Sequence, residues 1–382
     1  MNFQLMTDLL YRMAGKYYHG IDMCIYKNGK EVYRKQAGVG EVETGKPVDP
    51  DAMYYLFSCS KVMTCAAALQ LYEKGYYLLE DPISEYLPEF KDVTVNRYRN
   101  NRQLINSTPA HGPITIKHLF SMTSGINYDL TTPYIKEVIE RTNGKCPTNE
   151  IVKAIAKNPL QFEPGEHYMY GLGHDVIGRL IEVLSGMSFG EYMKKNLWDP
   201  CGLKHTTFKL TDAIKAKMQP RYYLVHEKNE FVRCENNNQF RFGEDSEYES
   251  GGAGIISCVS DYIKFADAMA NGGIAATGER ILTSRTIDIM RTNVLTKDQI
   301  ADMSKGPEGY GYGLGVRTMI DNSVSGRLTN IGEFGWDGAV GSYVQIDPKE
   351  GVALFAAENV SGPFNHDGPG RIGNVLSTIL NS

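Results

Sequence analysis

The sequence predicts a mixed α/β protein in which one antiparallel sheet is built from both ends of the chain. Three observations carry this prediction. Short β-rich runs lie within residues 20–38, similar runs lie within residues 309–359, and helical patterns dominate the stretch between them. Because a sheet must bury a face against another layer, we expect an α/β subdomain formed by about 1–75 with 250–382. An inserted, mainly helical subdomain of about 76–249 should meet it at a cleft, a common place for an active site.

The first two elements are an amphipathic helix and a hairpin. Leu5, Leu9, Leu10 and Met13 fall on one face of a helix. Two β-rich runs, GIDMCIYK and KEVYRKQAG, then flank Asn28-Gly29. Asn-Gly between such runs is the strongest short signal for a two-residue hairpin turn.

Helices are predicted through the middle of the chain and strands near its end. The helical patterns are KVMTCAAALQLYEKG (61–75), TPYIKEVIERTNG (132–144), NEIVKAIAKN (149–158) and two more around GMSFG (186–190). The short strands are GYGYGLGVRTM (309–319), RLTNIGEF (327–334), GSYVQID (341–347) and GVALFAAEN (351–359), and RIGNVLSTILNS (371–382) reads as a terminal helix.

Composition and charge exclude several classes of protein. The chain has 382 residues and a net charge of −5, with no run of like charges, so neither nucleic acid nor a membrane surface is an expected partner. No window approaches 18 uncharged apolar residues, and no membrane span is expected. Seven scattered cysteines without C-x-x-C spacing predict reduced thiols in a cytoplasmic protein. The histidine spacing predicts no metal site.

GMSFG matches G-x-S-x-G, the nucleophile elbow of α/β-hydrolases, in which a strand precedes the serine. Here HDVIGRLIEVLS (174–185) precedes it with helical spacing, and Gly186 should end that helix. Ser188 and Glu191 then form a capping box that begins the next helix. We therefore predict that Ser188 is a helix cap and that a catalytic serine lies elsewhere.

Ser58-Cys59-Ser60-Lys61 is an S-x-x-K sequence followed by an Ala- and Leu-rich helix. Ser58 should lie at or just before the first helical turn, so that Ser58 and Lys61 share one face. The helix N-terminus favours a negative oxygen, and a lysine with a depressed pKa can accept the proton of a serine. The alternative is that Ser58 or Ser60 only caps the helix while Lys61 is solvated.

The segments around S-x-x-K resemble the class C β-lactamases and their relatives, the penicillin-binding-protein-like serine hydrolases. These relatives include D-aminopeptidases and the family VIII carboxylesterases. The resemblance runs in order through DPISEYLPEF (81–90), ITIKHLFSMTSGINYD (114–129), EPGEHYMYGLGHDVIG (163–178), YESGGAGIIS (248–257) and NIGEFGWDGAVGSYVQID (330–347). It covers nearly the whole chain and implies a single catalytic domain, 1–382, with the β-lactamase and penicillin-binding-protein fold.

The resemblance implies a role for individual residues. Ser58 corresponds to the acylated nucleophile, Lys61 to its proton acceptor and Tyr170 to the tyrosine of the family's Y-x-N motif. The oxyanion hole would consist of the backbone N–H groups of Ser58 and Ala339. We expect cations near the Tyr170 phenol to lower its pKa toward catalytic usefulness. His174 lies one helical turn beyond Tyr170, and we expect it to be structural, because a histidine on a helix face more often packs than catalyses.

Two substrate-binding positions depart from the family pattern. Leu172 stands where the Y-x-N motif has asparagine, and Trp336-Asp337-Gly338 stands in place of K-T-G. Trp336 would form an apolar wall of the pocket or a platform for the acyl group. Asp337 would disfavour anionic substrates if it faces the pocket, whereas strand alternation could instead turn it away.

We therefore predict a serine hydrolase that forms a covalent acyl-enzyme without a metal or organic cofactor. A small carboxylic ester is the expected substrate, because the two groups that bind β-lactams in the family are replaced. Three alternatives stay open: hydrolysis of amides as a β-lactamase or D-amino-acid peptidase, acyl transfer to an alcohol, and a ligand sensor without turnover. The sequence does not define the oligomeric state.

Overall fold

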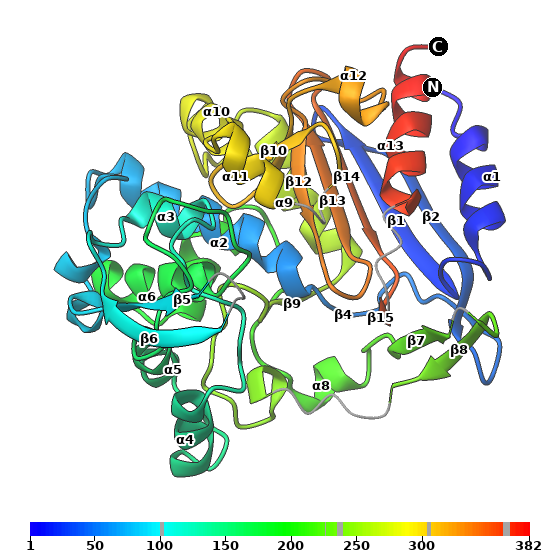
Figure 1. The fold of residues 1–382 in the computed structure, drawn as a ribbon. Coiled ribbons are helices and arrows are strands. Elements are labelled where there is room, and N and C mark those ends of the chain that lie inside the picture. Colours follow the sequence, from blue (N-terminus) through cyan, green and yellow to red (C-terminus); the bar gives the residue numbers. More distant parts are fainter. Residues whose placement is uncertain (100–102, 226, 235–239, 304–306, 362–366) are drawn as a thin grey trace.

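Both ends of the chain contribute to one eight-stranded sheet (Figure 1), as predicted. The structure is a computed structural model that describes residues 1–99, 103–225, 227–234, 240–303, 307–361 and 367–382. All neighbouring strands of the sheet are antiparallel, in the order β10-β11-β12-β13-β14-β1-β2-β3. Their bounds are β1 Gly20–Lys27, β2 Lys30–Glu41, β3 Lys46–Pro47, β10 Tyr310–Tyr312, β11 Arg317–Met319, β12 Phe334–Asp337, β13 Tyr343–Asp347 and β14 Val352–Ala357.

The predicted hairpin at Asn28-Gly29 joins β1 and β2. Asn28 and Gly29 have φ values of 51° and 80°, the positive values that a tight hairpin turn requires at both central positions. On its other edge β1 pairs with β14, with Cys24 opposite Phe355. The two ends of the chain are therefore hydrogen-bonded to each other in the centre of the sheet.

The predicted strand RLTNIGEF is wrong over most of its length. Only Phe334 belongs to β12, which continues to Asp337, while residues 327–333 lie in turns and irregular structure. Gly332 has a φ of 83°, and this positive value is incompatible with an extended strand. Similarly, GYGYGLGVRTM forms two short strands, because Gly315 with a φ of 84° lies in the turn between β10 and β11.

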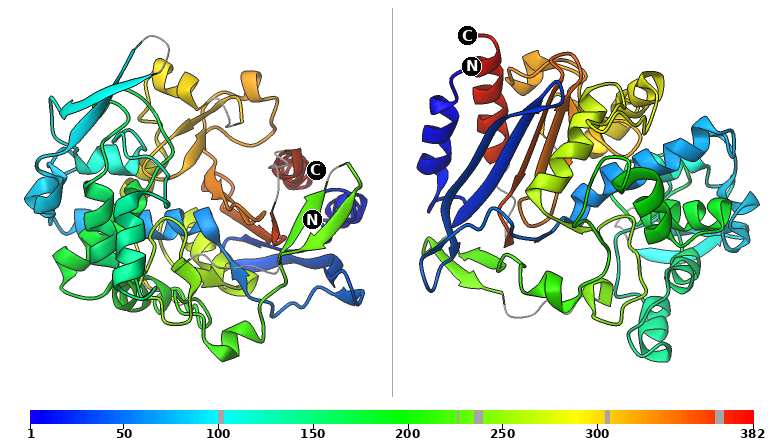
Figure 2. Two further views of the ribbon diagram at one scale, coloured as in Figure 1. Left: turned by 60° about the horizontal axis from the view of Figure 1, so that its bottom comes forward. Right: turned by 180° about the vertical axis from the view of Figure 1, so that it is seen from behind.

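Helices cover both faces of the sheet. The helices α1 (Gln4–Met13) and α13 (Asp367–Leu380) lie side by side on one face (Figures 1 and 2). The other face packs against α9 (Val259–Ala270) and the long central helix α2 (Ser60–Glu73). Strand alternation divides the core accordingly: in β14, Leu354 packs toward α1 and α13, whereas Phe355 packs toward α9 and α2.

The remaining helices lie between α2 and α13 along the chain. They are α3 Ile116–Phe120, α4 Pro133–Arg141, α5 Thr148–Ala156, α6 Gly173–Ser185, α7 Phe189–Met193, α8 Asp212–Lys215, α10 Ser284–Arg291, α11 Lys297–Asp302 and α12 Asn322–Ser325. Of these, α3 to α6 are on the far side of α2 from the eight-stranded sheet (Figure 1). Small sheets join β4 (Tyr54–Tyr55) to β9 (Ile256–Ser257), β5 (Thr94–Tyr98) to β6 (Leu104–Pro109), and β7 (Tyr222–Val225) to β8 (Glu230–Arg233) and β15 (Val360–Ser361). The subdomain boundaries stay a prediction. None of the helices in the described ranges is long and apolar enough to cross a bilayer.

The GMSFG segment connects two helices, as predicted. Gly186 ends α6 with a φ of 70°, and Ser188 is the N-cap of α7. The Ser188 hydroxyl accepts a hydrogen bond from the Glu191 amide at 3.2 Å, and the Glu191 carboxylate accepts one from the Ser188 amide at 3.0 Å. No strand precedes Ser188, and its side chain is fully engaged as a cap.

Replacing Ser188 by alanine should therefore lower the free energy of unfolding but leave the rate of ester hydrolysis unchanged. Loss of an N-cap of this type typically costs about 1 kcal/mol. Urea denaturation of the wild type and of Ser188→Ala would measure the difference in the free energy of unfolding, and ester hydrolysis would be assayed in parallel. A large loss of activity in a stably folded Ser188→Ala protein would contradict this interpretation.

Candidate active site

Ser58 and Lys61 lie together where the central helix begins. Ser58 belongs to a single 3-10 turn, Phe57–Cys59, that leads into α2, and Lys61 lies in the first turn of α2. The Lys61 Nζ is 3.3 Å from the Ser58 Oγ and donates to the Gly252 carbonyl at 2.6 Å. Lys61 is fully buried. Lys61 is therefore not solvated, and the alternative in which Ser58 or Ser60 only caps the helix beside a solvated lysine is wrong. The Ser60 hydroxyl accepts a hydrogen bond from the Ile255 amide at 3.1 Å.

A strained backbone position lies next to Ser58. Phe57 has a φ of 46°, in the left-handed region that a bulky residue rarely adopts. Strain of this kind costs about 1–3 kcal/mol and persists only where surrounding contacts enforce it. The Phe57 ring packs against Phe242 with ring centres 5.5 Å apart. A tight, strained turn thus presents Ser58, although it lies far from the G-x-S-x-G sequence.

Tyr170 brings a third group to Ser58. It lies just before α6, and its hydroxyl donates to the Ser58 Oγ at 2.6 Å. Its ring is stacked between Tyr128 and Trp336, with centre-to-centre distances of 5.5 and 5.7 Å. The indole Nε1 of Trp336 donates to the Tyr170 hydroxyl at 3.3 Å. The Ser58 oxygen therefore has an amine on one side and a phenol on the other.

Burial affects the proton affinities of these two groups in opposite ways. Desolvation lowers the pKa of Lys61, and Arg241 lowers it further, while Tyr128 and Asp175 act to raise it. Desolvation also raises the pKa of Tyr170, which outweighs the lowering by its hydrogen bonds with Ser58 and Trp336. The expectation that nearby cations would lower the Tyr170 pKa is thus wrong in this state of the protein. The deprotonated, proton-accepting form of Lys61 is therefore easier to populate than that of Tyr170.

A buried polar network lies behind Lys61. The Asp175 Oδ1 accepts hydrogen bonds from the Tyr248 hydroxyl at 2.6 Å and the Ser250 hydroxyl at 2.5 Å. Its Oδ2 is buried without a partner among the described residues. A Cβ placed on Gly252 would come within 2.5 Å of this Oδ2 and 3.4 Å of the Lys61 Nζ. The position therefore needs glycine, and Gly252 separates the carboxylate from the amine.

A second cation enters from a different segment. The Arg241 guanidinium donates to the Tyr128 hydroxyl at 3.1 Å. Because the Tyr128 ring stacks on Tyr170 and lies 5.5 Å from the Lys61 Nζ, Arg241 belongs to the same buried cluster. Two buried basic side chains, Lys61 and Arg241, and the Asp175 carboxylate thus lie on the Ser58 side of the site.

The end of strand β12 lies directly beside the Ser58 turn. The Ser342 hydroxyl donates to the Leu56 carbonyl at 2.8 Å, and the Cys59 thiol donates to the Trp336 carbonyl at 3.5 Å. These two contacts hold the turn that contains Gly338 and Ala339 against the start of α2. The position suits the predicted pair of amide donors at Ser58 and Ala339, although that role stays a prediction.

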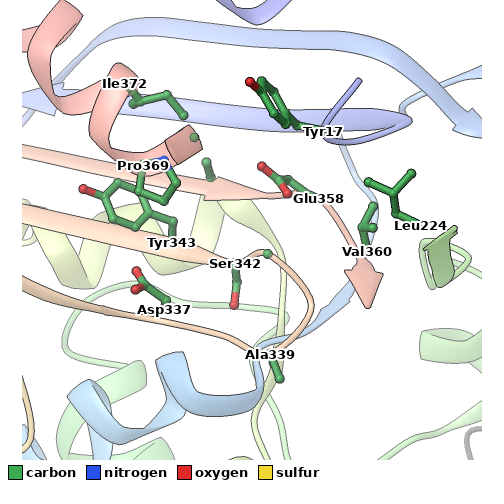
Figure 3. A pocket seen from close by; sticks show the side chains of 13 residues that line it. Tyr17, Leu224, Asp337, Ala339, Ser342, Tyr343, Glu358, Val360, Pro369 and Ile372 are labelled. Atoms are coloured by element: carbon green, nitrogen blue, oxygen red, sulfur yellow. The ribbon is translucent and has the colours of Figure 1, made fainter. Parts of the chain in front are cut away.

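Asp337 points to the opposite face of the sheet from Trp336. Its carboxylate accepts from the Arg317 guanidinium at 3.1 Å, and Figure 3 shows it lining a cavity under α13. Strand alternation has therefore turned the charge away from Ser58, which was the alternative left open by the sequence. Asp337 is therefore not positioned to repel an anionic substrate at the reacting carbonyl.

Leu172 and His174 are both packed in the interior. Leu172 is 1% exposed and is the N-cap residue of α6. Its amide donates a hydrogen bond to the Asn127 carbonyl at 3.2 Å. The His174 Nε2 lies 3.2 Å from the Phe120 carbonyl, and burial and the nearby Lys61 lower the His174 pKa to about 3. A histidine that stays neutral in the core supports the structural interpretation of this residue.

Sequence reasoning missed Tyr128, Asp175, Arg241, Tyr248 and Ser250. Four of them lie inside or directly beside quoted family segments, GINYD, GLGHDVIG and YESGGAG, but nothing in their local spacing indicated a shared cluster. Arg241 lies outside those segments. The only available signal was the concentration of polar side chains in otherwise apolar or Gly-rich runs.

The fold and the arrangement around Ser58 define a β-lactamase-like protein. The family model described as Beta-lactamase matches residues 11–376, and the chain belongs to this family. The resemblance to the β-lactamase and penicillin-binding-protein group is thereby confirmed, as is the predicted fold class.

Named relatives include an esterase and acyltransferases. Esterase EstB of Burkholderia gladioli is 25% identical over 89% of this chain and 87% of its own length. Acyltransferase calJ of Penicillium decumbens is 28% identical over 91% of this chain and 85% of its own. The unliganded structure of simvastatin synthase (LovD) from Aspergillus terreus has a TM-score of 0.81 at 21% identity and covers 98% of each chain, a likeness of fold alone.

Proposed function

We propose that the protein is a serine carboxylesterase that acts on small esters through a covalent acyl-enzyme on Ser58. The observation that carries the proposal is the position of the Ser58 Oγ, 3.3 Å from the Lys61 Nζ and 2.6 Å from the Tyr170 hydroxyl. Both distances are suited to proton transfer, and a nucleophile held against its base is the general signature of nucleophilic catalysis.

In the proposed acylation step, neutral Lys61 takes the Ser58 proton as the oxygen attacks the ester carbonyl. The negative oxygen of the tetrahedral intermediate is stabilised by the amides of Ser58 and Ala339. Tyr170 then gives its proton to the departing alkoxide, which leaves as the alcohol. The resulting phenolate lies beside the newly formed Lys61 ammonium, 4.7 Å from the ring centre before reaction, so the two charges compensate each other.

In the proposed deacylation step, the Tyr170 phenolate takes a proton from water, and the hydroxide attacks the acyl carbonyl. When the second tetrahedral intermediate collapses, Ser58 leaves and recovers its proton from Lys61. All protons are thus returned to their starting positions. An alcohol in place of water would give transesterification, and the similarity to a protein named Acyltransferase calJ favours this as a second activity.

The departures from the family pattern favour esters over β-lactams. Trp336 stands in place of the lysine that would pair with a β-lactam carboxylate, and it stacks on Tyr170 instead. Leu172 is buried and offers no amide to an acylamino side chain. A panel of nitrophenyl esters, a chromogenic cephalosporin and D-alanyl amides tests the proposal: turnover of amides but not esters would overturn it. Stable acylation without release would instead support the sensor alternative.

The charge of Asp175 should affect the pH at which the acidic limb of the kcat/KM profile lies. Only neutral Lys61 can accept the serine proton, so kcat/KM should fall as the pH falls through the Lys61 pKa. Asp175 raises that pKa, because its negative charge favours the ammonium form. Replacing it with asparagine should therefore lower the pKa and shift the acidic limb of the kcat/KM profile to lower pH.

Ser250→Ala provides the matched control for Asp175→Asn. It removes one hydrogen bond to the same carboxylate at 2.5 Å but leaves the charge in place. We expect its acidic limb to remain near that of the wild type. An unchanged limb in folded Asp175→Asn would show that the Asp175 charge does not act on the titrating group.

A further inference from the structure

A cavity lies on the far side of β12 from Tyr170, between the sheet and the two terminal helices (Figure 3). The space between its lining residues is about 690 Å³, a value that includes solvent at its open mouth. Ala339, whose amide is proposed to bind the oxyanion, lies at one end of this cavity, and Tyr17 lies at the other. Ser58, Lys61 and Tyr170 are not part of the lining, so a substrate held at the Ala339 amide would reach this cavity by passing around Ala339 at the end of β12.

Glu358 is the feature of this cavity that needs an explanation. Its carboxyl group faces the cavity (Figure 3) and has no hydrogen bond or ion pair with any residue that the structure describes. Desolvation alone raises its pKa to about 8. The Glu358 side chain is half-buried and keeps part of its contact with solvent. A ligand that covers this unpaired carboxyl group would therefore have to supply it with a partner.

The local backbone makes room for this carboxyl group. Gly341 has a φ of 86°, and a Cβ at this position would come within 2.5 Å of the Glu358 Oε2. A glycine is therefore required both by the turn after β12 and by the position of the carboxyl group. The arrangement keeps Glu358 directed into the space beside Ala339.

The charges that line the cavity favour a positively charged ligand. Its lining includes two carboxylates, Glu358 and Asp337, and no lysine, arginine or histidine among the described residues. Asp337 already has the Arg317 guanidinium as its partner, which leaves Glu358 without a cation. Lys16 lies 4.9 Å from the ring centre of Tyr17, but it is exposed and is not part of the lining. The rest of the wall is mainly apolar or aromatic, with Tyr343, Ile372 and Val360.

We infer that this cavity binds an organic ammonium group of the substrate, with Glu358 as its counter-ion. The inference rests on the proposed esterase function and adds the substrate class: esters that carry a cationic nitrogen beyond the reacting carbonyl. An anionic group would meet the Glu358 carboxylate, and a neutral apolar group would leave that carboxylate buried without a partner. The cation both pairs with Glu358 and places its alkyl groups against the apolar wall.

A matched pair of esters tests the inference at pH 8.5, above the raised pKa of Glu358. Acetylcholine and 3,3-dimethylbutyl acetate have nearly the same shape and differ in charge. The wild type should prefer acetylcholine in kcat/KM, and Glu358→Gln should reduce the ratio of the two kcat/KM values about tenfold, mainly through the KM for acetylcholine. Glu358→Asp, which keeps the charge, should retain part of the preference. Glu350→Gln, which removes the same charge at the other end of β13 and β14, should leave the ratio unchanged.

Calorimetric binding to the Ser58→Ala variant separates this inference from the proposed function. Acetylcholine should bind to Ser58→Ala and bind more weakly to Ser58→Ala with Glu358→Gln. Equal ratios in the wild type and Glu358→Gln, or equal binding to the two Ser58→Ala proteins, would overturn the ammonium site even if both esters are hydrolysed. Glu358-dependent binding without any hydrolysis by the wild type would uphold the site and overturn the esterase proposal.

Discussion

Replacing Ser58 by alanine should abolish ester hydrolysis and all covalent labelling by a fluorophosphonate. The Ser58 Oγ is the atom that both the Lys61 amine and the Tyr170 hydroxyl approach, so we expect it to accept the acyl group. Loss of the serine nucleophile of a serine hydrolase can lower kcat by about 10⁶-fold. Mass spectrometry of the labelled wild-type protein should locate the adduct on the peptide that contains Ser58.

Two controls make this expectation specific. Ser60→Ala removes the neighbouring hydroxyl, which accepts from the Ile255 amide, and should retain the adduct with a modest loss of stability. Ser188→Ala should also be labelled normally. An adduct on Ser60 or Ser188, or full activity in Ser58→Ala, would remove the basis of the proposed mechanism.

Lys61→Ala and Tyr170→Phe should each lower kcat by about 10²- to 10⁴-fold, the usual contribution of a positioned proton-transfer group. The kcat of the double variant should be only slightly lower than that of the more impaired single variant, because both groups take part in proton transfer at the Ser58 oxygen. Steady-state kinetics of the four proteins measures this coupling, and circular dichroism verifies that each is folded.

Trp336→Phe is the informative companion to these variants. Phenylalanine keeps an aromatic ring against Tyr170 but removes the indole N–H that donates to the Tyr170 hydroxyl at 3.3 Å. We expect a smaller loss than in Tyr170→Phe. If the effects of Lys61→Ala and Tyr170→Phe instead multiply independently, the two residues do not act as a unit and the proposed relay is incorrect.

Local chemistry explains what the sequence could predict about the site. Ser58 and Lys61 are three residues apart at the start of a helix, so their proximity follows from helix geometry, and the Ser188 cap follows equally from a short-range pattern. The role of Tyr170 could be predicted only from its place in the ordered series of segments that resemble the family. The direction of Asp337 could not be settled because it depends on which face of β12 meets α13, a property of the whole sheet.

Long-range packing explains what the sequence could not predict. Asp175 and Tyr248 are 73 residues apart, and their hydrogen bond exists only because the segment before α9 packs against α6. The raised pKa of Tyr170 has the same origin, since burial of the phenol outweighs its hydrogen bonds with Ser58 and Trp336. The strand predicted at RLTNIGEF failed for a local reason, the positive φ of Gly332, which composition alone does not reveal.

The stacking of Trp336 on Tyr170 also gives the protein an optical signal at its candidate site. The chain has only two tryptophans, and the other, Trp198, is buried in the core away from Ser58. The Trp336 indole is partly exposed, and its N–H is bonded to the hydroxyl that would exchange protons during each turnover. An acyl group entering beside Ser58 must disturb that indole, so the change in ultraviolet emission on mixing enzyme with ester can follow acylation and release in real time, without a chromogenic substrate.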